Sequence, residues 1–345
     1  MTTSYCYDPF NLRHHLSGHP ENRARLAGTW ELLHADGILA DLLATPCTPA
    51  SDEQLLRVHS RRHLSTVAQA AQRNAHLDSD TYVGSDSEQA ARLAAGGLCN
   101  VVGAVLGGQA SNGFALVRPP GHHATPERGM GFCLYNNVAI AARAAQAEHG
   151  LERVLVVDFD VHHGNGTQDA FYEDGSVLFF STHQHPYYPG TGHWREMGRG
   201  AGGGATVNVP FPAGVGDAGY AAAFDSILTP AARRFQPQLI LVSAGYDAHW
   251  NDPLASMQLT IPGYAALVAR LLGLAGELCA GRMVCALEGG YHLEVLAHAV
   301  RNTLRQLSGQ SQRIDDPLGP SPWEERDASA LLAQVRQIHD LSGAS

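Results

Sequence analysis

The sequence has few charged residues, and acidic residues outnumber basic ones. Asp, Glu, Lys and Arg make up 16% of the 345 residues, and the formal net charge is −10. Because a nucleic-acid-binding protein needs a basic surface to neutralise phosphates, this balance argues against one. It is compatible with a cationic small molecule or a basic peptide as the ligand.

Paired cysteines, a signal peptide and a long apolar run are also missing. The six cysteines are scattered without a C-x-x-C pair, which predicts reduced core thiols in a cytoplasmic protein. The N-terminus, MTTSYCYDPFNLRHH, has no apolar segment of the signal-peptide kind. No stretch has 18 consecutive apolar residues, so we expect no membrane span and no membrane partner.

What the chain does contain is a regular alternation of apolar segments and helical stretches. VLVVDFD, SVLFFSTH and QLILVSAG are typical of buried strands, and helices of about 15 residues are expected between them, for example at 220–235 and 293–307. This pattern predicts an α/β fold with a mostly parallel sheet and helices on both faces. Residues 24–75 are predicted to be helical with two breaks. Residues 1–309 are predicted to form one domain, and residues 310–345 a linker and a helical surface appendage.

Ionisable residues follow four of the predicted strands. PPGHH comes after LVR, DFDVHH after VLVV, YDAHW after LILVSAG, and EGGYH after VCAL. In parallel sheets the ligand site lies beyond the carboxyl ends of the strands. The four strand ends therefore predict a single site built from loops rich in histidine, aspartate and glycine.

Asp158, Asp160 and His162 stand at alternate positions, so an extended segment would point them to one face. Ionisable groups in an apolar setting need partners, and a divalent metal is the simplest one. Carboxylate and imidazole ligands suit Zn²⁺, with Fe²⁺ as an alternative. Asp247 is the best candidate for a third ligand from another strand end. The competing interpretation is a hydrogen-bonded cluster without a metal.

The pair His122–His123 and the tyrosine of EGGY could supply the remaining chemistry. Two adjacent imidazoles can act as acid and base if each has a different partner. Solvent-exposed loop histidines are the alternative. Two glycines would let Tyr291 approach a pocket, where its phenol could polarise a carbonyl. By itself this last motif is weak, because Gly-Gly-aromatic loops are common.

Six motifs occur in one order between Arg118 and Tyr291, namely PPGHH, GFCLYNN, VDFDVHHGNGTQ, PGTG, SAGYDAHW with a following DP, and LEGGY. Together they resemble the zinc-dependent histone deacetylase family, which includes acetylpolyamine amidohydrolases and acetoin-utilisation proteins. The resemblance extends from HPEN at His19 to about Leu307. Asn165 in HHGNG is similar to the class II and bacterial deacetylase-like branch.

The resemblance implies a three-layer arginase/deacetylase-like α/β fold and one catalytic zinc ion. The implied zinc ligands are Asp160, His162 and Asp247. The family also binds structural potassium. One implied potassium site consists of Asp158, Asp160, His162, Ser181 and Thr182, and a second lies near Phe171, Asp174 and Val177.

The resemblance also assigns catalytic roles. His123 matches the general base and acid, and His122 matches its electrostatic partner, with Asp158 as the carboxylate that supports His122. Tyr291 matches the residue that polarises the acyl carbonyl. Asn165 stands where some members have an aspartate behind His123, and an amide should favour the protonated imidazole less than a carboxylate does. His163 is expected to face the other way.

The implied activity is removal of acetyl, or a related acyl group, from acetylated lysine or a similar acylated primary amine. The walls of the acyl-lysine tunnel match Gly131, Phe132 and Tyr188. An acetylpolyamine amidohydrolase is the first alternative. Polyamine-selective relatives place a carboxylate at the pocket mouth, whereas Leu254 occupies the corresponding position here, which weakens that alternative.

Two further alternatives keep the fold but change the function. An arginase-type enzyme with two manganese ions needs additional carboxylates, but Gly164 and His249 occupy those positions. A non-catalytic acyl-lysine-binding relative would lose a metal ligand or the tyrosine, and this chain retains them all. The sequence does not predict an oligomeric state.

Overall fold

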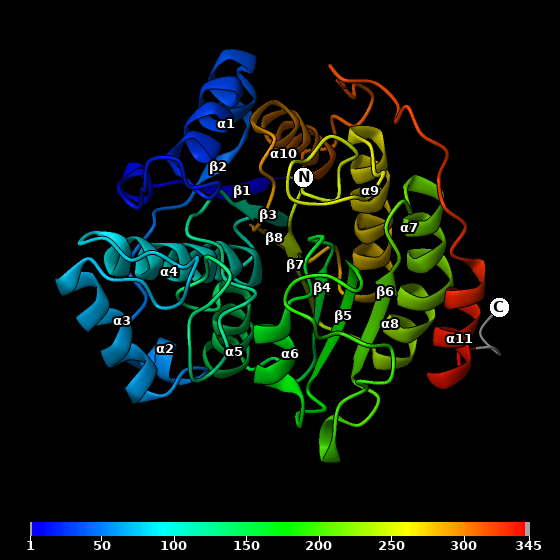
Figure 1. Cartoon of the computed structure of the whole chain (residues 1–345), viewed down its shortest axis with the longest axis horizontal. Coiled ribbons are helices and arrows are strands. Elements are labelled where there is room, and N and C mark those ends of the chain that lie inside the picture. Colours follow the sequence, from blue (N-terminus) through cyan, green and yellow to red (C-terminus); the bar gives the residue numbers. More distant parts are fainter. Residues whose placement is uncertain (1, 342–345) are drawn as a thin grey trace.

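The protein is built around one sheet of eight parallel strands, seen in Figure 1 in a computed structural model that describes residues 2–341. The strand order is β2-β1-β3-β8-β7-β4-β5-β6. The strands are β1 Thr3–Cys6, β2 Leu43–Ala44, β3 Asn112–Ala115, β4 Val154–Asp158, β5 Val177–Gln184, β6 Thr206–Phe211, β7 Leu239–Ala244 and β8 Met283–Leu287.

Eleven α-helices are formed by the described residues, and they cover both faces of the sheet. They are α1 Arg23–Asp36, α2 Asp52–Leu56, α3 Arg61–Arg73, α4 Ser87–Leu106, α5 Asn137–His149, α6 Asn165–Phe171, α7 Asp217–Ala223, α8 Thr229–Phe235, α9 Ile261–Leu278, α10 Leu293–Leu307 and α11 Ser329–Ile338. The predicted helix at 220–235 is interrupted by a π-helical turn at Phe224–Leu228. The prediction for 293–307 matches α10.

Strand β4 illustrates why the core has two halves. Leu155 and Val157 pack with α1 and α7 to α11, whereas Val154 and Val156 pack with α2 to α6 on the opposite face. Alternate side chains of a strand point to opposite faces, so a strand covered on both sides must be apolar throughout. In Figure 1, α3, α4 and α5 accordingly lie on one side of the sheet and α7, α8 and α9 on the other.

Sheet order brings the four polar strand ends together. The strands β3, β8, β7 and β4 are consecutive neighbours in the sheet, although β3 and β8 are far apart in the sequence. After these two strands, the backbone N–H of Gly121 donates to Glu288, which is 167 positions away. The loops after these four strands carry PPGHH, EGGYH, YDAHW and DFDVHH, respectively. One edge of the sheet therefore receives all of the predicted ionisable groups.

Two short strands at one side of the sheet, β1 and the edge strand β2, were missed by the sequence prediction. β1 has four residues near the N-terminus, and β2 has two residues inside the 24–75 segment that was expected to be helical with breaks. Both strands are defined by pairing, since Ser4 lies opposite Leu43 on one side and opposite Gly113 on the other. Strands this short have too few residues for a periodic pattern, so their partners decide their conformation.

The C-terminal segment packs against the sheet layers. Leu332, Val335 and Leu341 are buried in the same apolar cluster as α7 to α10. The Glu325 carboxylate accepts the backbone N–H groups of Ala218 and Gly219 at the start of α7. The predicted surface appendage therefore contributes to the core, and the boundary at residues 309 and 310 stays a prediction.

Helices α4 and α9 are long and apolar enough to cross a membrane by length and composition alone. Of the α4 window, 72% is buried inside the protein, and core helices commonly pass the same test. The two helices are thus weak evidence for a membrane span, and the expected absence of a membrane partner stays a prediction.

Candidate active site

Three of the predicted metal ligands meet where β4 and β7 end. Ligand atoms of Asp160, His162 and Asp247 all lie within 4.8 Å of one another. The Nδ1 atom of His162 is 3.2 Å from Asp160 Oδ1 and 3.2 Å from Asp247 Oδ2. Both carboxylates are fully buried, and the imidazole is 9% exposed.

This arrangement fits a cation better than a hydrogen-bonded cluster. A neutral imidazole has at most one proton on Nδ1, so two carboxylates at this nitrogen would have to share it. Burial alone would lower the pKa of His162, but Asp160 and Asp247 outweigh it and raise the pKa to about 10. Two buried carboxylates that converge on one imidazole nitrogen are typical of a metal site whose ligands surround a positive charge.

The adjacent residues His122 and His123 are buried at 3% and 4% exposure, which excludes the alternative of solvent-exposed loop histidines. The Nδ1 atom of His122 lies 3.0 Å from Asp158 Oδ2, whereas the Nδ1 atom of His123 lies 2.8 Å from Asn165 Oδ1. Their ring centroids are 4.0 Å apart. Each imidazole thus has its own partner, one ionisable and one neutral.

The surroundings of the two histidines shift their pKa values in opposite directions. Burial lowers the pKa of His122, but Asp160 and Asp158 outweigh burial and raise that pKa well above its usual range. Burial, His122 and His162 together hold the pKa of His123 well below its usual range. These shifts favour the protonated form of His122 and the neutral form of His123.

Two glycines place Tyr291 above the ligand cluster. A Cβ atom at Gly289 would lie 2.1 Å from Asp247 Oδ2, so only glycine fits there, and its N–H donates to Asp160 Oδ2 at 2.7 Å. Gly290 has φ +120°, a conformation that favours glycine. Burial raises the pKa of Tyr291 well above its usual range, so the phenol remains a donor at neutral pH.

A cavity of about 230 Å³ opens over these residues. All four residues predicted to contact the substrate line it, and so do His123, His162 and Tyr291. The predicted wall residues are Gly131, Phe132, Tyr188 and Leu254. Asp80 and Tyr187 also line the cavity. Sequence reasoning missed both, although Tyr187 is adjacent to Tyr188 and could have been considered with it.

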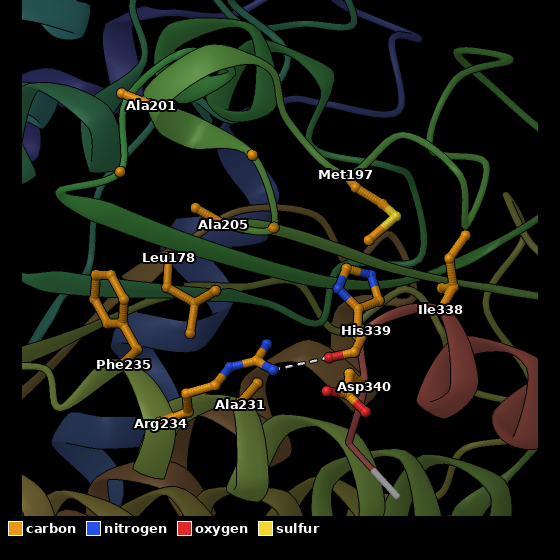
Figure 2. A pocket seen from close by; sticks show the side chains of 13 residues that line it. Leu178, Met197, Ala201, Ala205, Ala231, Arg234, Phe235, Ile338, His339 and Asp340 are labelled. Carbon is orange, nitrogen blue, oxygen red and sulfur yellow. Dashed lines mark hydrogen bonds between the residues drawn. The ribbon is translucent and has the colours of Figure 1, made fainter.

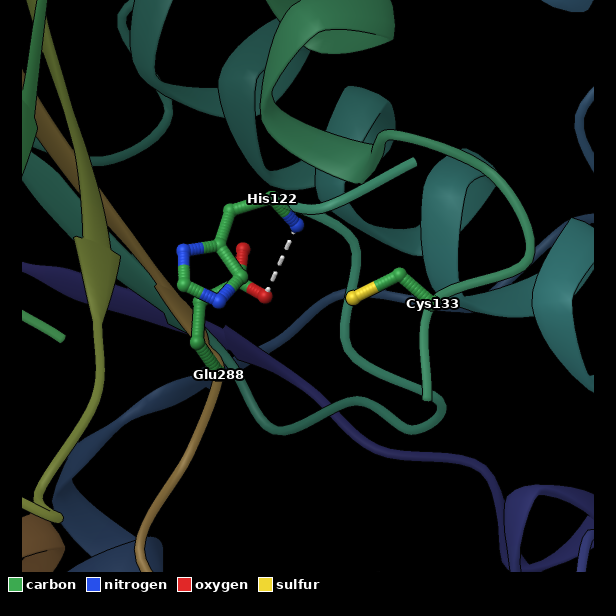
Figure 3. A group of neighbouring side chains, drawn as sticks. All are labelled: His122, Cys133 and Glu288. Carbon is green, nitrogen blue, oxygen red and sulfur yellow. Dashed lines mark hydrogen bonds between the residues drawn. The ribbon is translucent and has the colours of Figure 1, made fainter. Parts of the chain in front are cut away.

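A second buried group lies beneath the site and consists of His122, Cys133 and Glu288 (Figure 3). The Glu288 carboxylate accepts the backbone N–H groups of Gly121 at 2.7 Å and His122 at 3.2 Å. It also accepts a hydrogen bond from the Ser243 hydroxyl at 3.2 Å. Because its oxygens already have donors, Glu288 acts as an anchor for the His122 loop. The EGGY motif contains Glu288, but the motif alone gives no sign of this anchoring role.

His163 and the predicted potassium residues other than His162 are not part of the cavity lining. His163 contacts the Thr191 hydroxyl at 2.8 Å and Gln168 Oε1 at 3.1 Å, so it faces away from the ligand cluster as expected. Asp158 lies opposite Ser181 in the pairing of β4 with β5, and Thr182 follows. In the second predicted potassium site, Asp174 forms an ion pair with Arg143 at 2.6 Å. These residues are placed close together, but potassium binding stays a prediction.

Larger cavities elsewhere lack the chemistry of this site. The cavity in Figure 2 has a volume of about 430 Å³ and lies between β5, α8 and the end of α11. Leu178 and Phe235 line it, and Arg234 donates to the carbonyl oxygen of His339 at 2.8 Å. His339 and Asp340 line it, but it contains none of the predicted site residues, so cavity size does not locate the active site.

Comparison with known proteins assigns the family. The model of the histone deacetylase domain matches residues 19–307. The chain belongs to the histone deacetylase family. The solved structure of the HDA15 HD domain is similar, with a TM-score of 0.89, 37% identity, and coverage of 98% of this chain and 94% of that one. The predicted arginase/deacetylase-like fold is therefore confirmed.

Curated relatives of the family come from distant organisms. Histone deacetylase 10, chloroplastic, of Oryza sativa subsp. japonica is 42% identical over 98% of this chain and 81% of that protein. A probable deacetylase of Archaeoglobus fulgidus is 40% identical over 99% and 97%, respectively. The histone deacetylase-like amidohydrolase of Pseudomonas aeruginosa is 41% identical over 87% and 78%. These similarities support a deacetylase or related amide hydrolase.

A buried ionic network of Glu21, Arg25 and Arg118 supports the loop that carries Tyr291. The sequence motifs did not predict it. Arg25 on α1 donates to the carbonyl oxygens of Gly290 at 2.7 Å and Glu288 at 2.5 Å, and its guanidinium lies 4.9 Å from the centroid of the Tyr291 ring. Glu21 accepts from Arg25 at 3.0 Å. Glu21 is part of the HPEN segment, where the family resemblance begins, but the resemblance assigned no role to Glu21.

Replacing Glu21 with glutamine should destabilise the protein by about 3–5 kcal/mol, because Arg25 and Arg118 would keep buried charges without a counterion. Burial raises the pKa of Glu21, but Arg118 and His14 outweigh burial and hold that pKa well below its usual range. The stabilisation is therefore present above the unfolded-state pKa of about 4.3 and is lost as the pH falls through the lower folded-state value.

Urea unfolding of the wild type and Glu21→Gln at pH 7 and at pH 4 measures both effects. The difference between the two proteins should be large at pH 7 and smaller at pH 4. Equal unfolding free energies at pH 7 would contradict the role assigned to this network.

Proposed function

We propose that this protein is a zinc-dependent deacetylase that hydrolyses the amide of acetylated lysine or a similar acylated primary amine. Family membership supports the reaction class. The observation that carries the proposal is the convergence of Asp160, His162 and Asp247 beneath a cavity that also contains a neutral imidazole and a protonated phenol.

Zinc is the metal that we propose for the three-residue ligand group, with Fe²⁺ as the alternative. Asp160, His162 and Asp247 would hold it, and when bound it would supply Lewis-acid polarisation of the amide carbonyl and acidify a water molecule. The structural potassium sites implied by the resemblance belong to the same proposal. Ser181 and Thr182 would supply oxygen ligands for the first of them.

His123 would act as the general base and then as the general acid. If its Nδ1–H donates to Asn165 Oδ1, the Nε2 lone pair remains free to take a proton from water. The nearby His122 cation disfavours a second positive charge and keeps His123 neutral until that proton transfer. His123 can then return the proton to the departing amine nitrogen.

Tyr291 would donate a hydrogen bond to the carbonyl oxygen of the substrate, which becomes negatively charged during attack by water. Its phenol lines the cavity with His123 and His162. Because the surrounding loop holds the phenol in place before the reaction, this donor costs little reorganisation. Acetate and the free amine are the products.

The walls of the cavity suit a straight alkyl chain. Phe132 is 5.9 Å from Tyr291 between ring centroids, and Tyr188 is 5.1 Å from the imidazole ring of His123. At the cavity rim, Asp80 supplies a carboxylate that could accept a peptide N–H or pair with a distant ammonium. This carboxylate favours keeping an acetylpolyamine amidohydrolase as the second candidate, although Leu254 is neutral.

Acetate release by the zinc-loaded protein tests the proposal, with acetyl-lysine peptides, longer acyl-lysine peptides, N-acetylputrescine and acetylspermidine as substrates. The sequence contains no lysine, so every acetyl-lysine signal in the assay comes from the substrate. Higher kcat/KM for acetyl-lysine supports the first candidate, and higher kcat/KM for the acetylpolyamines supports the second. No release from the whole panel would leave a non-catalytic binding module.

The metal count separates the proposal from a dimanganese enzyme. His249 occupies a position where that chemistry needs a carboxylate, and its Nδ1 accepts the backbone N–H of Asn251 at 3.1 Å. We expect one catalytic transition metal ion per chain. Two manganese ions per chain with arginase-type activity would refute the deacetylase assignment. A cytoplasmic location is part of the proposal and can be checked by fractionation.

Asn165→Asp should shift the pH dependence of catalysis. A carboxylate at this position would favour protonated His123, so its pKa should rise. Because the base must be neutral, the acidic limb of the kcat/KM profile should move to higher pH in the variant. Asn165→Ala serves as the control, since it removes the hydrogen bond without adding charge. A profile of Asn165→Asp that coincides with the wild type would contradict this assignment.

A further inference from the structure

Asp252 is a buried carboxylate that neither the sequence motifs nor the ligand cluster assigns to a role. It lies in the loop after β7, five residues beyond Asp247, and is 5% exposed. Its Oδ2 atom accepts the backbone N–H of Tyr291 at 2.7 Å and that of His292 at 3.2 Å. Its Oδ1 atom accepts the backbone N–H of Leu254 at 2.9 Å.

One side chain therefore joins two loops with different tasks. The loop after β8 carries the Tyr291 phenol, and the loop after β7 carries Leu254, which lines the cavity. Buried carboxylates are costly unless they are hydrogen-bonded, and Asp252 meets that requirement entirely with backbone donors from these loops. Its oxygens are thus committed to loop geometry and not to the ligand cluster.

Tyr291 needs such an anchor because of the two glycines before it. Gly289 and Gly290 have no side chains to restrict the backbone, and Gly290 adopts φ +120°. Arg25 fixes this segment through the carbonyl oxygens of Glu288 and Gly290, but it makes no hydrogen bond to the backbone of Tyr291 itself among the described residues. Asp252 binds the N–H of Tyr291 directly, at the point where the chain leaves the glycines.

Leu254 has a second anchor, which separates the effects of losing Asp252. The Tyr187 hydroxyl donates to the Leu254 carbonyl oxygen at 2.9 Å. Removal of the carboxylate should therefore disturb the phenol more than the cavity wall. Misplacement of a catalytic group by a fraction of an ångström lowers turnover more than it lowers substrate affinity.

We propose that Asp252 is a positioning residue that holds the Tyr291 phenol over the reacting carbonyl by binding the backbone of the loop after β8. The inference rests on the proposed hydrolysis of acylated amines. It assigns no contact between Asp252 and the substrate, so its effect is expected on kcat and not on metal binding or on the substrate's binding constant.

The test compares Asp252→Asn and Asp252→Ala with the wild type, using zinc-loaded protein and an acetyl-lysine peptide. In Asp252→Ala we expect kcat to fall by about 10- to 100-fold and KM to change by less than about threefold. The kcat of Asp252→Asn should lie between those of the wild type and Asp252→Ala, because the amide retains one oxygen acceptor. Metal content and the unfolding temperature are measured for each variant.

A double-mutant cycle with Tyr291→Phe distinguishes positioning from general damage to the fold. If Asp252 acts through the phenol, adding Asp252→Ala to Tyr291→Phe should lower kcat by less than about threefold further, so the two effects are not additive. A purely structural role predicts that the effects multiply. The proposal would be overturned if the losses of kcat from Asp252→Ala and Tyr291→Phe multiplied in the double variant. An unchanged kcat in both Asp252→Ala and Asp252→Asn would also overturn it.

Asp217 provides a matched control. Its carboxylate also joins two segments, accepting the backbone N–H of Thr260 at 2.8 Å and the Thr260 hydroxyl at 2.6 Å, but it does not line the cavity. Asp217→Asn should lower the unfolding temperature and leave kcat unchanged. If the wild type releases no acetate from the substrate panel, the proposed function is refuted. If the wild type is active and the Asp252 variants are equally active, only the role proposed for Asp252 is refuted.

Discussion

Replacing Tyr291 with phenylalanine should lower kcat for amide hydrolysis by about 10²- to 10³-fold, the effect typical of losing one oxyanion donor. The hydroxyl would be lost, but the ring would keep its contacts with the Arg25 guanidinium and the Phe132 ring. KM should change much less than kcat, because the hydrogen bond strengthens as charge develops on the carbonyl oxygen. Steady-state kinetics with an acetyl-lysine peptide measures both values.

Two controls make the result specific to the phenol. The unfolding temperature and the metal content of Tyr291→Phe should match those of the wild type, since the substitution removes no backbone contact. A substrate that already carries a good leaving group still needs the oxyanion stabilised, so its hydrolysis should also slow. A variant with wild-type kcat would show that Tyr291 has no part in the chemistry.

Asp247→Asn should abolish stoichiometric zinc binding and, with it, measurable deacetylase activity. The amide removes the negative charge that the metal requires, while its oxygen can still accept the backbone N–H of Val161, which Asp247 Oδ1 binds at 2.9 Å. The fold should therefore persist without the metal. Elemental analysis of dialysed protein, together with acetate release, measures the loss.

Thermal unfolding gives an independent measurement of the same site. A ligand that binds only the folded state stabilises it by about 4 kcal/mol at a free concentration 1,000 times its Kd. Zinc should accordingly raise the unfolding temperature of the wild type, and a chelator should reverse the rise. Neither treatment should move the Asp247→Asn transition. Full zinc occupancy in this variant would remove Asp247 from the ligand set.

Residue patterns predicted the ligand group because Asp160 and His162 are only two residues apart and directly follow a strand. The expected extended conformation was wrong, since β4 ends at Asp158 and the chain bends at both ligands, but their short separation still leaves His162 Nδ1 3.2 Å from Asp160 Oδ1. Asp247 was predicted because it follows another strand, and the structure places β4 and β7 side by side, so their carboxyl ends meet at the same edge. The family motifs then predicted the catalytic role of Tyr291 and the residues of the cavity walls.

The supporting residues could not be predicted in the same way. Arg25 contacts Gly290 across 265 positions, and Asp252 contacts Tyr291 across 39. Neither belongs to a periodic pattern with its partner, and an arginine in a helix or an aspartate before proline is common on protein surfaces. Their roles depend on burial and on backbone donors from other segments, which only the packed chain brings together.

The sequence by itself therefore determined the set of chemical groups and the edge of the sheet where they gather. It could not, from residues alone, distinguish His122 from His123, which are identical neighbours. Tertiary structure decides between them, because Asp160 and Asp158 raise the pKa of His122, whereas burial together with the neighbouring His122 and His162 lowers the pKa of His123. In a buried site the charge of an imidazole is set by its spatial neighbours, and these come from a different strand end.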